Sequence, residues 1–305
     1  MELKRVVVTG LGALTPVGNT VAEAWENLVN GVSGAGPITR FDASKFKTQF
    51  ACEVKNFNVA DFIDRKEARK MDLYAQYAIV AAKEAIEDSA MDLESVDKNK
   101  IGVIFGVGIG GIRTFEEEMI GYAGTKDTIG PKFNPFFIPK MIADIASGHI
   151  SIMYGFHGPN FTTTSACASS SNAIADAFNY IRLGKANVIV AGGAEAAISP
   201  GGVGGFNAMH ALSTRNDEPT KASRPFSASR DGFIMAEGAG CLILEELEHA
   251  KARGAKIYAE LVGAGLSADA HHLTASHPEG LGAKLVMQNA LEDAGMKPED
   301  IDYIN

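Results

Sequence analysis

The chain has 305 residues, of which 46% are hydrophobic and 21% are charged, and its formal net charge is −9. This charge argues against a nucleic-acid-binding protein, and no apolar segment approaches the roughly 20 residues that a membrane-spanning helix needs. Three widely spaced cysteines argue against a disulfide framework, so we expect a cytoplasmic protein in a reducing compartment.

Short apolar or β-branched segments alternate with helical segments along the chain. The segments that predict strands are residues 5–9, 50–54, 101–105, 161–164, 187–191, 238–244, 257–263 and 302–305. Helices are predicted for residues 21–29, 71–90, 140–153 and 283–294. Residues 208–230, rich in polar residues, predict a long ordered loop. Such alternation is typical of an α/β fold whose helices flank its sheets.

The strand and helix pattern begins again after Gly254. We therefore expect a first unit at residues 1–253 and the start of a second unit at residues 254–305. Residues 302–305 resemble the opening of a strand, which leads us to expect that the chain is the front part of a longer protein.

Residues 161–172, with the sequence FTTTSACASSSN, are the most informative stretch. β-Branched residues change to small ones around Cys167, and a helical pattern that ends at Gly184 follows. Cys167 is thus expected on a sharp turn, at or just inside a helix N-terminus, where unpaired N–H groups lower a thiol pKa. Its small neighbours leave room for a substrate carbonyl. The pattern favours a cysteine nucleophile elbow over a structural buried thiol, which is our interpretation of Cys52 and Cys241.

Two glycine motifs raise the alternative of a dinucleotide site. Residues 106–111 (GVGIGG) follow a predicted strand and match G-x-G-x-x-G, and residues 8–12 (VTGLG) resemble the first turn of such a domain. The first motif lacks a strand that ends in an acidic residue about 20 positions later. The second runs into Pro16, and proline is poorly tolerated inside a helix. We expect both motifs to allow close packing of the backbone between layers instead.

A cysteine nucleophile usually needs a nearby base, and the chain has seven histidines. His249 lies among charged neighbours and is expected to be solvated, whereas His271 and His272 form the best-placed pair in a loop. A metal site through Asp269 is not expected, because adjacent histidines point apart and no third ligand is suitably spaced.

The segment TTSACASS at residues 163–170 resembles the active-site motif of the β-ketoacyl-acyl-carrier-protein synthases, members of the thiolase-like superfamily. The resemblance covers the whole chain, is closest to the long-chain enzymes of the family, and extends to residues 7–18, 65–72, 211–216, 223–226, 230–233 and 237–240. It implies a layered α-β-α-β-α fold of two duplicated halves, the second only begun here. It also implies a homodimer that performs decarboxylative Claisen condensation in fatty-acid elongation.

In that family the cysteine accepts an acyl group from the pantetheine arm of a carrier protein, and the carbanion of decarboxylated malonyl-carrier protein then attacks the thioester. By position, Cys167 is the nucleophile, and its backbone N–H forms half of the oxyanion hole. The resemblance implies no cofactor beyond the carrier's own arm. The other implied positions are an acyl-pocket gate at Gly108 and Ile109, a pocket-lining Phe206, Phe137 reaching into the pocket of the other subunit, and an entrance loop with His272 and Thr274.

A cluster of basic residues is expected to dock the acidic carrier protein. Arg65 and Arg69, and likewise Lys66 and Lys70, are spaced by four, and like charges at that spacing destabilise a helix. An anionic partner would neutralise them, whereas a merely solvated face softened by acidic neighbours remains the alternative. Lys132 is assigned to the same docking surface.

Some features of the family have no counterpart in the chain. The decarboxylation histidines, the lysine and the phenylalanine–glycine loop would all follow Asn305, and His210 stands where related enzymes carry an arginine. We therefore expect this chain alone to be acylated but unable to condense. Two alternatives remain open: a thiolase or CoA-dependent acyltransferase with the same elbow, and a non-catalytic chain-length partner, against which Cys167 counts.

Overall fold

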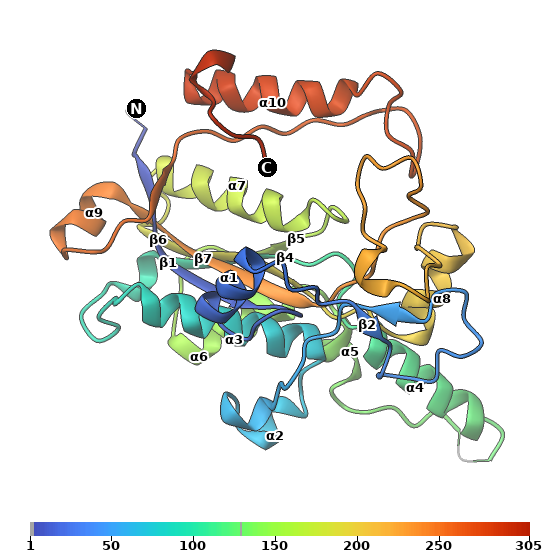
Figure 1. Cartoon of the computed structure of the whole chain (residues 1–305). Coiled ribbons are helices and arrows are strands. Elements are labelled where there is room, and N and C mark those ends of the chain that lie inside the picture. Colours follow the sequence, from blue (N-terminus) through green and yellow to red (C-terminus); the bar gives the residue numbers. More distant parts are fainter. Residues whose placement is uncertain (1–2, 129) are drawn as a thin grey trace.

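Six strands form one mixed sheet, in the order β5-β4-β6-β7-β1-β8, in the computed structural model, which describes residues 3–128 and 130–305 (Figure 1). Strand β4 is parallel to both β5 and β6, and β7 is antiparallel to β6 and β1. The strands are β1 (Val6–Leu14), β4 (Ile101–Gly106), β5 (Asn160–Thr163), β6 (Val188–Glu195), β7 (Gly238–Glu246) and β8 (Ala259–Leu261). A separate pair joins β2 (Gly36–Pro37) and β3 (Phe50–Ala51).

Helices cover both faces of this sheet. In Figure 1, α3 and α6 lie on one side of the sheet and α7 on the other, with α10 beyond α7. The α/β fold predicted from the sequence is thereby confirmed. The helices are α1 (Val21–Val29), α2 (Arg65–Ala68), α3 (Leu73–Asp88), α4 (Ile112–Thr125), α5 (Phe137–Met141), α6 (Ile145–Tyr154), α7 (Ser169–Arg182), α8 (Pro200–Ala208), α9 (Leu247–Ala252) and α10 (Leu281–Ala294).

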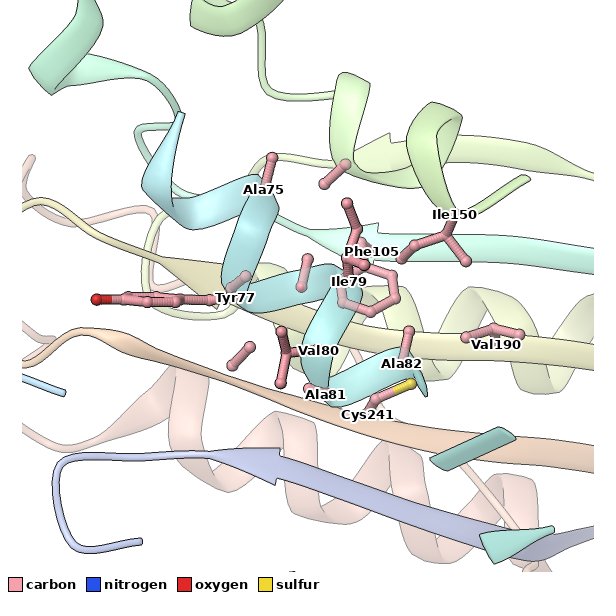
Figure 2. Close-up of a cluster of buried hydrophobic side chains, with 14 of the residues drawn as sticks. Ala75, Tyr77, Ile79, Val80, Ala81, Ala82, Phe105, Ile150, Val190 and Cys241 are labelled. Carbon is pink, nitrogen blue, oxygen red and sulfur yellow. The ribbon is translucent and has the colours of Figure 1, made fainter. Parts of the chain in front are cut away.

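Helix α3 forms the centre of the largest hydrophobic core. Asp72 caps its N-terminus by accepting the N–H of Tyr74, and most of its residues are buried. Figure 2 shows Ile79 of α3 beside Phe105 of β4, with Ile150 of α6 close by. A helix with this much apolar surface is stable when packed layers cover it, and the sheet and α6 do so for the helix predicted at residues 71–90.

Glycines in β1 let the sheet approach α3 closely. A Cβ atom on Gly10 would lie 2.2 Å from the carbonyl oxygen of Ala85, and one on Gly12 would lie 1.9 Å from that of Ala81. The expected close packing of residues 8–12 is confirmed. The strand was expected to end before these glycines, but it continues to Leu14, because their missing side chains permit strand geometry directly against the helix.

The same kind of contact recurs near the C-terminal end of the chain. A Cβ atom on Gly263 would lie 2.7 Å from the N atom of Ala294, and one on Gly265 would lie 2.1 Å from the carbonyl oxygen of Val286. Both partners belong to α10. Residues 263–265 therefore pack on α10 as residues 10–12 pack on α3, a repetition that fits two duplicated halves.

Two predicted elements differ from the structure. The helix expected at residues 140–153 is divided, because Ile142 is extended (ψ 138°) and its carbonyl oxygen accepts the hydroxyl of Tyr74 at 2.5 Å. Residues 302–305 form no strand, and each of them is exposed. A strand needs a neighbour to satisfy its backbone, and the described sheet places none beside them.

Candidate active site

The site lies where three parallel strands end at one edge of the sheet. Thr163, Gly106 and Gly193 lie side by side in the register of β5, β4 and β6. The chain that leaves β5 carries Cys167, the chain that leaves β4 is the glycine-rich loop, and Glu195 closes β6. In open α/β sheets, ligands bind outside the carboxyl ends of the strands.

A hydrogen-bonded turn presents Cys167. Ala166 has a φ of +51°, in the left-handed region that non-glycine residues seldom adopt. The buried hydroxyl of Ser169 accepts the N–H of Ser165 at 2.9 Å and donates to the carbonyl of Ala166 at 2.6 Å. Thr163 in turn donates its hydroxyl to the carbonyl of Ser169 at 2.7 Å. Strain that neighbouring groups hold in place is typical of functional sites.

Cys167 lies just outside the helix that follows it. The sequence placed the residue at or just inside the helix N-terminus, but α7 begins at Ser169 with Ala168 as its N-cap. The reason is the turn: the hydroxyl of Ser169 holds residues 165–166 in a non-helical conformation, so helical geometry begins only after Cys167. The strand-to-helix elbow itself is confirmed, and Cys167 is exposed at its tip.

Glycines allow α7 to begin directly over the sheet. A Cβ atom on Gly106 would lie 2.2 Å from the carbonyl carbon of Ser169, and one on Gly193 would lie 1.8 Å from the hydroxyl of Ser170. The close packing expected of the 106–111 motif is confirmed at this position. The first turn of the helix, and with it Cys167, is thereby held against the ends of β4 and β6.

The three thiols have different environments. Cys241 is buried in β7, and burial raises the pKa of its thiol. Cys52 is half-buried, and burial likewise raises the pKa of its thiol, although nearby Lys55 opposes the shift. Cys167 alone is exposed. Since the thiolate is the nucleophilic form, the structure makes Cys167 the most accessible and least hindered of the three.

The side chain of Glu195 accepts hydrogen bonds from the glycine-rich loop of residues 106–111. Its carboxylate accepts the N–H of Ile109 at 2.8 Å and that of Gly110 at 3.2 Å. Burial raises the pKa of this carboxyl above its usual value, although the backbone donors oppose the shift. The loop lies close to this carboxylate at Gly108, because a Cβ atom there would lie 2.8 Å from the Glu195 Oε2 atom and 3.5 Å from the carbonyl oxygen of Ala166.

The two phenylalanines assigned to the acyl pocket lie on different helices. Phe206, on α8, packs edge-on against Phe233 with ring centroids 5.4 Å apart. Phe137, at the start of α5, stacks on Phe133 at 5.5 Å and on Phe115 at 6.3 Å. Both are partly exposed. Their assigned roles in the acyl pocket stay predictions.

The entrance-loop residues are exposed and held by local contacts. The Nδ1 atom of His272 lies 3.2 Å from the N atom of Thr274, an arrangement that closes a turn. The rings of His271 and His277 meet edge-on at 5.2 Å. His249, expected to be solvated, instead pairs with the buried carboxylate of Glu245 at 2.6 Å. Within residues 3–128 and 130–305, no group of three or more His, Cys, Asp or Glu side chains is arranged to hold a metal ion.

The expected docking residues lie on and around α2. Arg65, Lys66 and Arg69 are exposed, while Lys70 pairs with Glu67 at 2.6 Å. Lys132 is exposed in the loop before α5.

In the part of the chain that the structure describes, no helix combines the length and the apolarity needed to cross a membrane.

Glu195 and Ser169 are two residues of the site that the sequence did not predict. Their common signal is weak: one is an acidic residue at the end of an apolar strand, and the other is a serine among several near a reactive cysteine. Only the folded chain shows that each accepts backbone N–H groups around the site.

A mixed sheet, an exposed cysteine at a strand-to-helix elbow and helices on both faces define an enzyme of the thiolase-like class. The family described as "Beta-ketoacyl synthase, N-terminal domain" matches residues 3–250, and "Beta-ketoacyl synthase, C-terminal domain" matches residues 258–305. The chain belongs to the β-ketoacyl synthase family. The assigned division at residues 253 and 254 stays a prediction.

Curated relatives with about half of their residues identical carry a specific name. A protein of a Synechocystis species named "3-oxoacyl-[acyl-carrier-protein] synthase 2" is 50% identical over 306 residues, which cover 100% of this chain and 73% of the relative. A Staphylococcus aureus protein of the same name is 49% identical, with 99% of this chain and 72% of the relative covered. The chain is thus similar over its whole length to curated relatives named synthase 2.

Solved structures of the family share the fold. A β-ketoacyl synthase from Burkholderia phymatum superposes with a TM-score of 0.88 at 35% identity, covering 98% of this chain and 72% of that chain. A ketosynthase determined with its type II polyketide acyl-carrier protein, bound to a hexaketide, gives a TM-score of 0.88 at 33% identity, covering 99% of this chain and 73% of that chain.

Proposed function

We propose that the chain is the acyl-accepting part of a 3-oxoacyl-acyl-carrier-protein synthase, with Cys167 as the nucleophile. The observation that supports this proposal most directly is the elbow, where an exposed thiol follows a strained, hydrogen-bonded turn against the ends of three strands. A preorganised nucleophile of this kind reduces the entropy lost on reaching the transition state.

The proposed step is transfer of an acyl group between two thiols. The Cys167 thiolate attacks the carbonyl carbon of an acyl-pantetheine thioester and forms a new S–C bond. The bond from that carbon to the pantetheine sulfur then breaks, and the leaving thiolate takes up the proton that Cys167 lost. Backbone N–H groups at the elbow, including that of Cys167, are the proposed donors to the oxyanion.

The proposed partners are an acyl carrier protein and a second copy of the chain. The carrier is supported by the names of the relatives and by the related ketosynthase solved with its carrier protein. It is also supported by the exposed cations Arg65, Lys66 and Arg69, which suit an acidic surface. Because an exposed nucleophilic thiol stays reduced in a reducing compartment, we propose a cytoplasmic location. No cofactor beyond the carrier's pantetheine arm is proposed.

Intact mass spectrometry after incubation with acyl-carrier protein tests the proposal. The 305-residue chain is expected to gain one acyl group, mapped to Cys167, and Cys167→Ala is expected to gain none. Acyl-CoA in place of acyl-carrier protein tests the alternative of a thiolase or CoA-dependent acyltransferase, because equal or faster acylation by CoA thioesters would favour that class. Acylation of neither wild type nor variant would contradict the proposal.

We further propose that the 305-residue chain by itself does not condense the acyl group with malonyl-carrier protein. Polarising the malonyl thioester needs a base or donor at the site. Several histidines have other contacts: His249 pairs with Glu245, His272 closes its own turn, and His271 meets His277. A 3-oxoacyl product from material with the mass of this chain would contradict this part of the proposal.

A further inference from the structure

We infer that Glu195 is a positioning residue, which holds the loop of residues 108–110 against the Cys167 elbow and thereby orders the apolar wall beside the nucleophile. Three contacts carry this inference. The Glu195 carboxylate accepts the N–H of Ile109 at 2.8 Å and that of Gly110 at 3.2 Å. The third is the approach of the same loop to the elbow at Ala166.

The carboxylate stands at a fixed point of the fold. Glu195 is the last residue of β6, where it pairs with Gly238 of β7, two residues beyond the last pair of β6 with β4 at Gly193. Its carboxylate contacts the loop that follows β4. A Cβ atom on Gly108 would lie 2.8 Å from Oε2, so a side chain there would displace either the carboxylate or the loop.

The loop in turn touches the turn that carries the nucleophile. A Cβ atom on Gly108 would lie 3.5 Å from the carbonyl oxygen of Ala166. Ala166 is the strained residue directly before Cys167, with a φ of +51°. Ile109 is 44% exposed, so its apolar side chain is free to face a substrate. Glu195 thus binds the loop that approaches Ala166, and the hydroxyl of Ser169 binds the carbonyl of Ala166 itself.

The same contacts bear on the match of this loop to the dinucleotide motif. In dinucleotide sites the N–H groups of such a loop bind phosphate oxygens. Here two of them, from Ile109 and Gly110, are bonded to a carboxylate of the protein itself. Glu195 therefore takes the place of a phosphate at this loop, and the loop approaches the elbow at Ala166.

Two variants and a matched control test the inference. Glu195→Ala removes both acceptors, whereas Glu195→Gln keeps one acceptor oxygen and places a donor where the other stood. Glu53→Ala is the control, because the buried Glu53 also accepts two backbone N–H groups, those of Thr39 and Arg40. Amide hydrogen exchange gives the first readout. Glu195→Ala should speed exchange at Ile109 and Gly110, Glu195→Gln at one of the two, and Glu53→Ala at neither.

The second readout compares two alkylating agents that react with Cys167. Iodoacetamide is small, whereas N-dodecyl iodoacetamide carries a chain that resembles an acyl group. Glu195→Ala should lower the rate for the long agent relative to the small one by about tenfold, because an ordered apolar wall aligns only the long chain. Glu195→Gln should lie between wild type and Glu195→Ala, and Glu53→Ala should leave the ratio unchanged.

The inference is overturned if the ratio in Glu195→Ala equals that of wild type, or if Glu53→Ala changes it as much. If Glu195→Ala is unfolded, all of its amides exchange rapidly. The test then rests on Glu195→Gln, in which faster exchange at one of Ile109 and Gly110 supports the inference and unchanged exchange at both contradicts it. The choice of a dodecyl chain as a mimic of an acyl group rests on the proposed function, but alkylation of Cys167 does not require acyl transfer. A changed ratio without acylation by carrier protein would therefore overturn the proposed function and leave the role of Glu195 standing.

Discussion

Arg182, at the end of α7, donates its Nη1 group to both carboxylate oxygens of Asp293 in α10, at 2.8 and 2.7 Å. Asp293 also accepts the N–H of Ala264 at 2.9 Å. One ion pair thus connects the helix that follows the nucleophile with the helix and extended segment near the C-terminal end of the chain. The side chains are only 14% and 30% exposed, so solvent screens the pair less than a surface pair.

We expect Arg182→Gln to loosen residues 262–294 without unfolding the sheet. Hydrogen bonds to charged groups contribute about 1.5–3 kcal/mol each, and Asp293 would keep its bond from Ala264. Amide exchange and limited proteolysis should both increase in this segment. Lys83→Gln, which breaks the exposed pair of Lys83 with Glu87 in α3, is the control and should change neither. Unchanged protection of α10 in Arg182→Gln would contradict the prediction.

Acid should weaken the same connection. Burial raises the pKa of Asp293, but the bonds from Arg182 and Ala264 outweigh it and hold the pKa below its ordinary value. A carboxyl with a depressed pKa in the folded state stabilises it at pH values above its unfolded pKa, and this contribution is lost as the pH falls through the folded pKa. Protection of α10 should therefore decline below about pH 4, and it should decline less in Asp293→Asn.

A third prediction concerns the buried carboxylate of Glu245. Arg253 binds it through two bonds of 2.7 Å, and Thr9 donates a third at 2.7 Å. Arg253→Met leaves this carboxylate buried without its main partner, a change that typically costs about 3–5 kcal/mol. Chemical denaturation should show that loss. Lys251→Gln, which breaks the exposed pair of Lys251 with Glu248 in α9, should cost about 0.5 kcal/mol or less. Equal effects of the two variants would disprove the special role of Glu245.

An element of this fold is predictable from the sequence when the contacts that form it are between residues close together along the chain. Helix α1 was predicted at its observed bounds, because Thr20 caps it locally and its apolar residues follow the helical period. The elbow was predicted because a β-branched run beside small residues is a local signal. The division of the helix near Ile142 was not, because it depends on Tyr74, which is 68 positions away along the chain.

The site shows the same limit. Cys167 was identified from its neighbours in sequence, whereas Glu195 lies 86 positions from Ile109 and acts on the site through that distant backbone. His249 was expected in solvent, because its sequence neighbours are charged. In the fold, Glu245, four residues earlier in β7, is buried, and the Nδ1 atom of His249 lies 2.6 Å from its carboxylate. Buried polar contacts of this kind depend on packing that no local pattern encodes.

Ser169 should control the reactivity of the nucleophile. Its hydroxyl both accepts the N–H of Ser165 and donates to the carbonyl of Ala166. Ser169→Ala therefore leaves the N–H of Ser165 without its acceptor, while the carbonyl of Ala166 keeps only the backbone N–H of residue 169 as a donor. We expect alkylation of Cys167 by iodoacetamide to slow by about tenfold or more, since a displaced nucleophile loses alignment. Ser171→Ala changes an exposed serine in the same helix and should leave the rate unchanged. A rate unaffected by Ser169→Ala would show that the turn holds itself.

Cys167 should be the first thiol to react in the folded protein. Cys241 is buried and Cys52 is half-buried, and burial raises the pKa of both thiols. Limiting iodoacetamide at neutral pH, followed by peptide mapping, should place nearly all of the label on Cys167. Denatured protein serves as the control, because the preference should disappear once burial is lost. Preferential labelling of Cys52 or Cys241 in the native protein would refute the assignment of the nucleophile.

The last prediction concerns the carrier-protein surface. Lys66 lies in α2 and Arg69 directly follows it; both are exposed, and the protein as a whole carries a net charge of −9. A basic patch on an acidic protein attracts an acidic partner locally. The double variant Lys66→Glu, Arg69→Glu should therefore weaken binding of acyl carrier protein, by about tenfold or more at low ionic strength.

Salt and a charge-matched control separate this local effect from the overall charge. Raising the salt from about 0.01 M to 0.15 M shortens the screening length from about 30 Å to about 8 Å, so the difference between variant and wild type should shrink. Lys284→Glu, Lys297→Glu makes the same change in net charge at exposed positions on and beyond α10. If this control weakens carrier binding as much as the α2 variant, long-range repulsion explains the effect. If neither variant changes the affinity at low salt, α2 takes no part in docking.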